Sequence, residues 1–103
     1  MRMIMEGMDD EFLDLVADFL ESSKRLREAS ELCEDDPIKQ DMIKHIVQPF
    51  REAYERSNHV RHLSEVDYEG NRSFILKELR EIAELNNSMA EQIEKKLIPL
   101  AWN

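Results

Sequence analysis

Residues 73–98 read SFILKELREIAELNNSMAEQIEKKLI, and this stretch decides the fold. Five apolar residues and one asparagine recur in it at steps of three and four positions: Ile75, Leu79, Ile82, Asn86, Met89 and Ile93. In an α-helix, such steps place side chains on one face. Pro99 then ends the pattern, because proline cannot continue a helix. The stretch predicts a helix over about 72–98 with a single apolar stripe.

Two earlier stretches carry stripes of the same kind. The first consists of Phe12, Leu15, Phe19, Leu26 and Cys33, and the second of Ile43, Ile46, Phe50, Tyr54 and Ser57. They predict helices over about 9–34 and 37–64. The three predicted helices leave room for only two short turns, so neighbouring helices should run antiparallel. The predicted fold is an all-α, three-helix, up-down-up bundle formed by one domain over residues 1–103.

Proline, aspartate and glycine mark the boundaries of the predicted helices. Asp36 can cap the second helix, and Pro37 suits its first position, where a missing N–H costs nothing. Gly70 and Asn71 are typical of the second turn. Pro49 falls inside the second predicted helix, where it removes one backbone hydrogen bond. The apolar stripe keeps its phase across Pro49, which favours a kink over a break.

Composition excludes several classes of protein. The 103 residues include only 2 glycines and 3 prolines, which is typical of a helical protein and not of a sheet protein. A net charge of -9 does not favour nucleic-acid binding. No run approaches the roughly 20 consecutive apolar residues that a membrane span needs. The lone Cys33 predicts a buried thiol in a reducing compartment, and the first residues do not resemble a secretory signal, so we expect a cytoplasmic protein.

Apolar residues that fall off the three stripes predict a second buried face. So many of them on a thin bundle favour a homodimer or a helical partner protein, with dimerisation giving a larger helical bundle. The expected interface residues are Leu13, Leu20, Ile38, Met42, Val60, Leu63, Leu76, Ile98, Leu100 and Trp102.

Polar residues from all three helices should meet in one layer of the bundle. Counting outward from the two turns places Ser22, Ser23 and Asn86 near the level of Pro49. The proline leaves the His45 carbonyl without its helical donor. The hypothesis is a polar layer in which a serine hydroxyl or the Asn86 amide satisfies that carbonyl. The alternative is that Asn86 lies at the edge of its stripe, in contact with water.

One polar stripe on the second helix has residue types that could carry chemistry. Glu52, Glu55, His59 and His62 share a helical face and could ligate a metal such as zinc or iron. That face is turned away from the predicted core, which favours a solvated surface. Arg56 and His62 also fit the Arg-x5-His spacing that one family of helical ribonuclease domains uses. This spacing arises often by chance in charged helices, so the chain is not assigned to that family.

The sequence therefore predicts a small acidic helical-bundle protein that acts through protein–protein interaction, as a regulator or adaptor. It predicts no enzymatic activity and no cofactor. One alternative is a metal-binding or ribonuclease-like protein that uses Glu55, His59 and His62, or the Arg56–His62 pair. A second alternative is an acidic mimic of nucleic acid. These classes differ in a visible way, because an enzyme needs its side chains gathered in a cleft and an interaction module needs exposed apolar surface.

Overall fold

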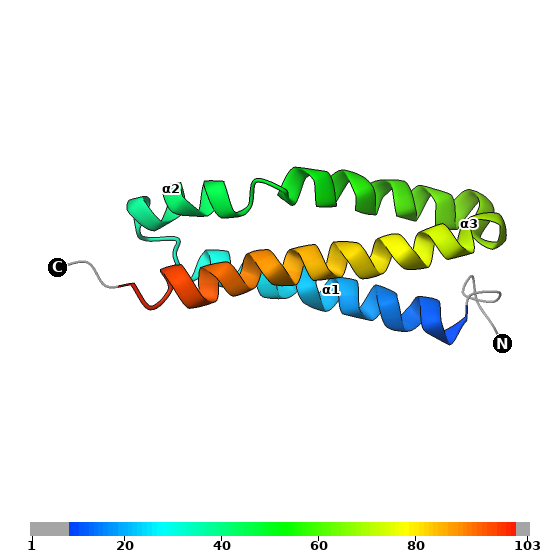
Figure 1. The fold of residues 1–103 in the computed structure, drawn as a ribbon, viewed down its shortest axis with the longest axis horizontal. Helices are drawn as coiled ribbons and strands as arrows, with labels where there is room; N and C mark the ends of the chain where they lie inside the picture. The colour runs from blue at the N-terminus through cyan, green and yellow to red at the C-terminus, as the bar shows by residue number, and fades with distance from the viewer. Residues whose placement is uncertain (1–8, 101–103) are drawn as a thin grey trace.

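A computed structural model describes residues 9–100, and the helices account for nearly all of them (Figure 1). Helix α1 spans Asp10–Glu31, α2 spans Pro37–Ile46 and α3 spans Phe50–Gln92. A short π-helical segment, η1, follows at Ile93–Leu97. The described part of the chain is therefore all-helical, as the sequence predicts. No helix in residues 9–100 combines the length and the apolar character that crossing a membrane requires.

Aspartate side chains cap the first two helices. The Phe12 N–H donates to Asp9 Oδ1 at 2.9 Å at the start of α1. Before α2, Asp36 Oδ1 accepts from the N–H groups of Ile38 and Lys39 at 3.0 and 3.2 Å. Pro37 is the first residue of α2, where its missing N–H leaves no bond unmade. The predicted start of the second helix is thus confirmed, whereas α1 ends at Glu31, three residues before the predicted end.

The chain is interrupted around Pro49 more strongly than the predicted kink. Helix α2 ends at Ile46, and a turn over residues 47–49 separates it from α3. The Val47 N–H still donates to the Ile43 carbonyl at 2.8 Å, but the Phe50 N–H donates to Val47 in a tighter turn. Because Pro49 has no N–H, the ladder cannot continue through it. The predicted single helix over 37–64 is therefore wrong, and its residues belong to α2 and to α3.

Helix α3 folds back on itself at Asp67. The backbone of Asp67 leaves the helical region, with φ -161° and ψ 71°, and the chain reverses direction there (Figure 1). Asp67 Oδ1 accepts from the Gly70 N–H at 3.0 Å, which caps the segment that follows. We refer to residues 50–66 as the N-terminal half of α3 and to residues 68–92 as its C-terminal half. The second predicted turn, between the helices predicted over 37–64 and 72–98, thus contains one residue with non-helical backbone angles, Asp67.

Ion pairs fix the relative directions of the segments. Arg72 Nε donates to Asp9 Oδ2 at 2.6 Å, and Arg25 Nε donates to Glu94 Oε2 at 3.0 Å. The start of α1 is therefore paired with the start of the C-terminal half of α3, and the end of α1 is paired with η1, which follows α3. Helix α1 and the C-terminal half of α3 run in the same direction (Figure 1). The N-terminal half of α3, which lies between them in the sequence, runs in the opposite direction.

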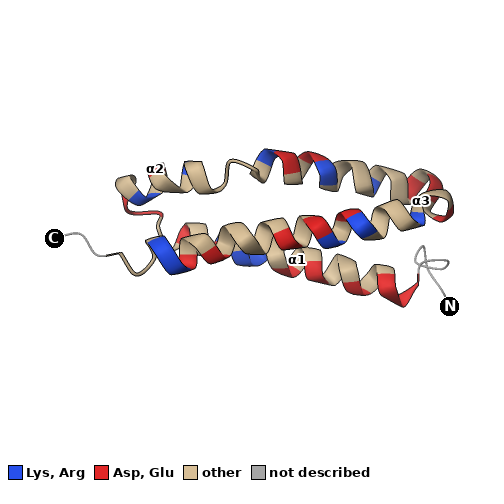
Figure 2. Cartoon of the chain, viewed as in Figure 1, with Lys and Arg blue, Asp and Glu red and all other residues tan. Residues whose placement is uncertain are grey.

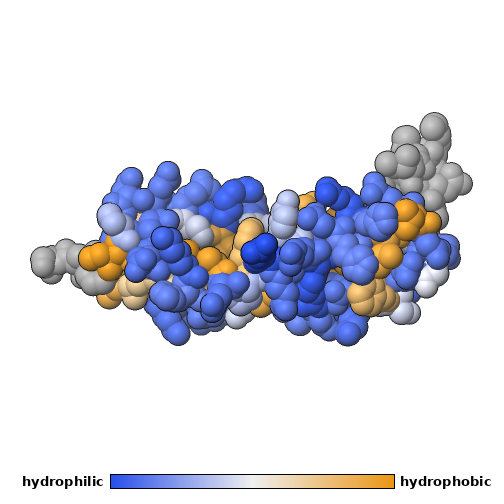
Figure 3. Space-filling view, turned by 90° about the horizontal axis from the view of Figure 1, so that it is seen from above, coloured by the Kyte–Doolittle hydropathy of each residue, from blue (hydrophilic) through white to orange (hydrophobic). Residues whose placement is uncertain are grey.

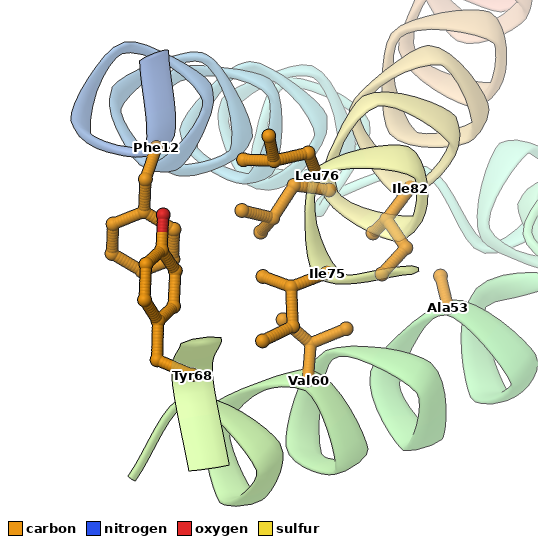
Figure 4. Packing of buried hydrophobic residues seen from close by; sticks show 8 residues of the cluster. Phe12, Ala53, Val60, Tyr68, Ile75, Leu76 and Ile82 are labelled. Carbon is orange, nitrogen blue, oxygen red and sulfur yellow. The ribbon is translucent and has the colours of Figure 1, made fainter. Parts of the chain in front are cut away.

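The core lies mainly on the C-terminal half of α3. Every residue of the stripe predicted over 75–93 is buried, including the fully enclosed Ile75 and Ile82. In one of two buried clusters, Phe12 of α1 meets Tyr68 edge to face, with ring centroids 5.0 Å apart (Figure 4). The other cluster gathers residues of α1, α2, the end of α3 and η1 and includes Cys33, which is buried as predicted. The C-terminal half of α3 thus serves as the central helix on which the others pack.

Candidate functional site

An open apolar groove runs between α1 and the N-terminal half of α3. Its largest pocket has a volume of about 580 Å³, and its lining includes Phe12, Val16 and Val60. A second pocket of about 430 Å³ lies against Leu26, Val47 and Phe50. A small central pocket of about 70 Å³ shares Phe19 and Ser57 with the first and Ser23 and Phe50 with the second. The three pockets therefore form one continuous groove.

Large apolar side chains on the walls of this groove are exposed. Leu20 is 59% exposed, Phe50 49% and Tyr54 58%. The rings of Phe50 and Tyr54 stack with centroids 6.4 Å apart. When the molecule is viewed from above relative to Figure 1, its apolar side chains appear as patches between hydrophilic ones (Figure 3). Large apolar side chains gathered along a groove are typical of a binding surface, whereas scattered ones need no explanation.

The charges that line this groove differ from those of the molecule as a whole. Its lining contains two cations, Arg27 and Arg61, and one anion, Glu65. The pocket on the other side of α1 has a volume of about 260 Å³ and is lined by three carboxylates and one arginine: Asp18, Glu21, Glu84 and Arg80. In a chain of net charge -9, the apolar groove is therefore locally basic.

The predicted interface residues divide into three sets. Exposed members of the set are Leu13, Leu20, Ile38, Met42 and Leu100. Leu63 and Ile98 are partly buried and pack against the two core clusters. Val60 and Leu76 are only 4% and 6% exposed, so they belong to the core of this chain, and Val60 also lines the groove. Trp102 lies outside the described residues.

Two groove residues lie in a different environment from the one that the sequence predicts. Phe50 and Tyr54 fall on the second apolar stripe and were expected in the core, but both are about half exposed. The reason is the break at Pro49, because a stripe traced through one continuous helix does not continue through two separate helices. One signal in the sequence could have indicated that this face is exposed. Phe50, Tyr54 and Arg61 follow one another at steps of four and seven, which places a charged side chain on the same helical face.

The predicted polar layer brings together serines and asparagine without His45. Asn86 Nδ2 donates to Ser22 Oγ at 3.2 Å and to Ser23 Oγ at 3.3 Å. The Ser22 hydroxyl donates to the Phe19 carbonyl at 2.7 Å. Within residues 9–100, none of these bonds reaches the carbonyl of His45, whose side of α2 is exposed. The hypothesis that this layer satisfies that carbonyl is wrong, and Pro49 is not among its hydrogen-bonded members.

The candidate metal ligands stay apart on the surface. Glu52, Glu55, His59 and His62 are all exposed. His59 contacts the ring of Phe74, with centroids 6.0 Å apart. Across the described residues, no three Asp, Glu, His or Cys side chains come close enough to hold a metal ion. The stripe therefore has the geometry of a solvated helix face.

Arg56 forms ion pairs within the bundle and does not form a site with His62. Its guanidinium donates to Glu78 at 2.8 and 2.5 Å and to Glu81 at 2.7 Å, bridging the two halves of α3. The hydrogen bond from Arg56 lowers the pKa of the Glu78 carboxyl, and the same contact raises the pKa of Arg56. His62 is exposed on the outer side of the helix. An arginine saturated by two carboxylates is a structural clamp rather than a group ready to bind phosphate.

Charged residues of both signs alternate along α3, whereas the charged residues in the first half of α1 are all acidic (Figure 2). A nucleic-acid mimic needs carboxylates spaced along one continuous surface, so this alternation does not favour that alternative. No family model, curated protein or solved structure matches this chain. The groove and its residues are therefore the features of this chain that bear on its function.

Proposed function

We propose that this chain is a non-enzymatic interaction protein that binds an amphipathic α-helix of a partner protein in the groove between α1 and α3. The observation that carries the proposal is the continuous apolar groove with Leu20, Phe50 and Tyr54 exposed along it. A groove between two helices accepts the apolar face of a third, with anchors at helical spacing. The partner would complete an arrangement in which four helical segments surround a shared core.

An enzymatic function has weaker support. A catalytic site needs titratable groups that converge in a pocket with altered pKa values. Among the described residues, the carboxyl and guanidinium groups with altered pKa are bound in ion pairs, as Arg56 is with Glu78 and Arg25 with Glu94. The pKa of Tyr68 is raised mainly by burial in the core. The groove itself is lined mainly by apolar residues and offers one carboxylate, Glu65. This composition suits binding better than proton transfer.

Self-association remains a prediction from the sequence. An up-down-up bundle that dimerises would bury several of the apolar residues that stay exposed in one chain, among them Ile38 and Met42 of α2. The mass in solution, measured by light scattering, checks this prediction. A charge introduced at Leu63, another of the expected interface residues, would also disturb the core against which Leu63 packs. Met42→Glu is the better choice.

A labelled peptide tests the proposed groove directly. The probe is an 18-residue helix with a leucine ridge at steps of three and four and with glutamine flanks, followed by fluorescence anisotropy. We expect saturable binding that the double variant Leu20→Ser/Phe50→Ser abolishes. The matched control is Leu32→Ser/Val66→Ser, which removes two exposed apolar side chains that do not line the groove. Absence of binding to the native chain, or equal loss in both variants, contradicts the proposal.

A further inference from the structure

The groove has the length of a helix of several turns. Along α1, its lining extends from Phe12 to Ser30, which corresponds to about 27 Å at the helical rise of about 1.5 Å per residue. The facing wall runs from Val47 to Glu65. An occupant that covers this length while burying one apolar face is an α-helix of about 18 residues.

Both arginines in the lining retain donors for an incoming carboxylate. Arg27 reaches Glu31 only at 3.8 Å, and both side chains are well exposed. Arg61 donates to the amide oxygen of Asn58 at 3.3 Å, and within the described residues it has no carboxylate within 4.0 Å. Arginine binds carboxylates through paired N–H donors, which adds geometric specificity.

Charge distinguishes between a foreign helix and a second copy of this chain in the groove. A two-fold dimer places the same surface of each copy against the other. With the groove at its centre, that arrangement would bring the arginines at the two ends of the groove, Arg27 and Arg61, against arginines of the second copy, with Glu65 as the one carboxylate in the lining to offset them. Like charges at an interface oppose association. A helix with acidic flanks meets these arginines with opposite charge instead.

We propose that the partner helix is acidic, with glutamate or aspartate flanking its apolar ridge at the levels of Arg27 and Arg61. This inference rests on the proposed function, since it assumes that the groove binds a helix. The overall charge of -9 does not prevent such binding. Charges further away than a Debye length of about 8 Å are largely screened at physiological salt, whereas the groove arginines are in direct reach.

Two peptides that differ only in flank charge test the inference. Both carry the same leucine ridge, and the flanks are all glutamate in one and all lysine in the other. We expect the native chain to bind the glutamate peptide about tenfold more tightly, since several exposed ion pairs contribute modestly each. The preference should shrink with added salt. In the double variant Arg27→Glu/Arg61→Glu the preference should reverse.

A matched control separates local charge from total charge. Lys44→Glu/Lys96→Glu changes the net charge by the same amount at exposed residues that do not line the groove, and it should keep the preference for the glutamate peptide. Equal affinity for both peptides, with binding still lost in Leu20→Ser/Phe50→Ser, overturns the inference and leaves the proposed function standing. A preference that survives the arginine reversal also overturns it. The native chain could instead bind neither peptide and form a dimer that Leu20→Ser/Phe50→Ser dissociates. That result overturns the inference, because it shows that the groove binds a second copy of this chain.

Discussion

At the residue scale, Glu78 is a buried carboxylate whose role in stability follows directly from its hydrogen-bond partners. It is buried in the C-terminal half of α3, and its carboxylate accepts two hydrogen bonds from Arg56. Glu78→Gln removes the charge and leaves the guanidinium with Glu81 as its carboxylate partner. We expect a loss of about 1–3 kcal/mol in the free energy of unfolding, as for other hydrogen bonds to charged groups. Urea denaturation followed by circular dichroism measures it.

The exposed pair of Arg51 and Glu55 provides the control for that variant. Its two atoms are 3.9 Å apart, and both side chains are mostly exposed. Glu55→Gln should change the free energy of unfolding by less than about 0.5 kcal/mol, because exposed ion pairs contribute little. Equal effects of Glu78→Gln and Glu55→Gln would contradict the role given to the buried clamp.

At the element scale, the reversal of α3 depends on Asp67 as a cap. The carboxylate accepts from the Gly70 N–H, and the Asn71 amide donates to the Asp67 carbonyl at 2.9 Å. A Cβ atom at Gly70 would lie 2.8 Å from Asp67 Cγ, so the absence of a side chain permits this contact. Asp67→Ala should destabilise the fold by about 0.5–2 kcal/mol, the usual cost of losing a cap. Thermal unfolding of Asp67→Ala beside Glu69→Ala, an exposed neighbour, checks this, and similar melting temperatures would contradict it.

The individual helices were more predictable than their arrangement. The stripe over 75–93 is buried throughout because one uninterrupted helix preserves its 3.6-residue period. The Asp36–Pro37 start was also readable, since capping is a local property of the sequence. Phe50 and Tyr54 were misplaced because the turn at Pro49 reorients the helix that follows. The groove could not be predicted, because it arises from the separation of two helices and not from the period of either.

At the scale of the whole molecule, carboxylates held by arginine make stability depend on pH. Hydrogen bonds from Arg56 lower the pKa of Glu78, and hydrogen bonds from Arg25 lower the pKa of Glu94. A carboxyl whose pKa is lower in the folded state stabilises the fold above its unfolded pKa, here near 4.5. That contribution disappears as the pH falls below this value. This contribution to stability should therefore be complete above about pH 4.5 and decline as the pH falls through the lowered pKa values of Glu78 and Glu94.

Urea midpoints across this range test the pH dependence. The native chain should lose stability steadily on acidification, and Glu78→Gln should lose less, because one of the titrating groups has been removed. Glu55→Gln should follow the native curve. If Glu78→Gln and the native chain fall in parallel, Glu78 does not contribute to the acid sensitivity.

The central claim is that the groove between α1 and α3 binds a helix, and amide chemical shifts measure this most directly. A ¹⁵N-labelled chain would be titrated with the glutamate-flanked peptide while each backbone amide is followed by NMR. The account predicts that the largest shifts lie on the groove walls, around Val16–Arg27 of α1 and Phe50–Glu65 of α3. Shifts centred on Arg80–Asn87 of α3, which form the far wall of the acidic pocket, or on α2, would contradict it.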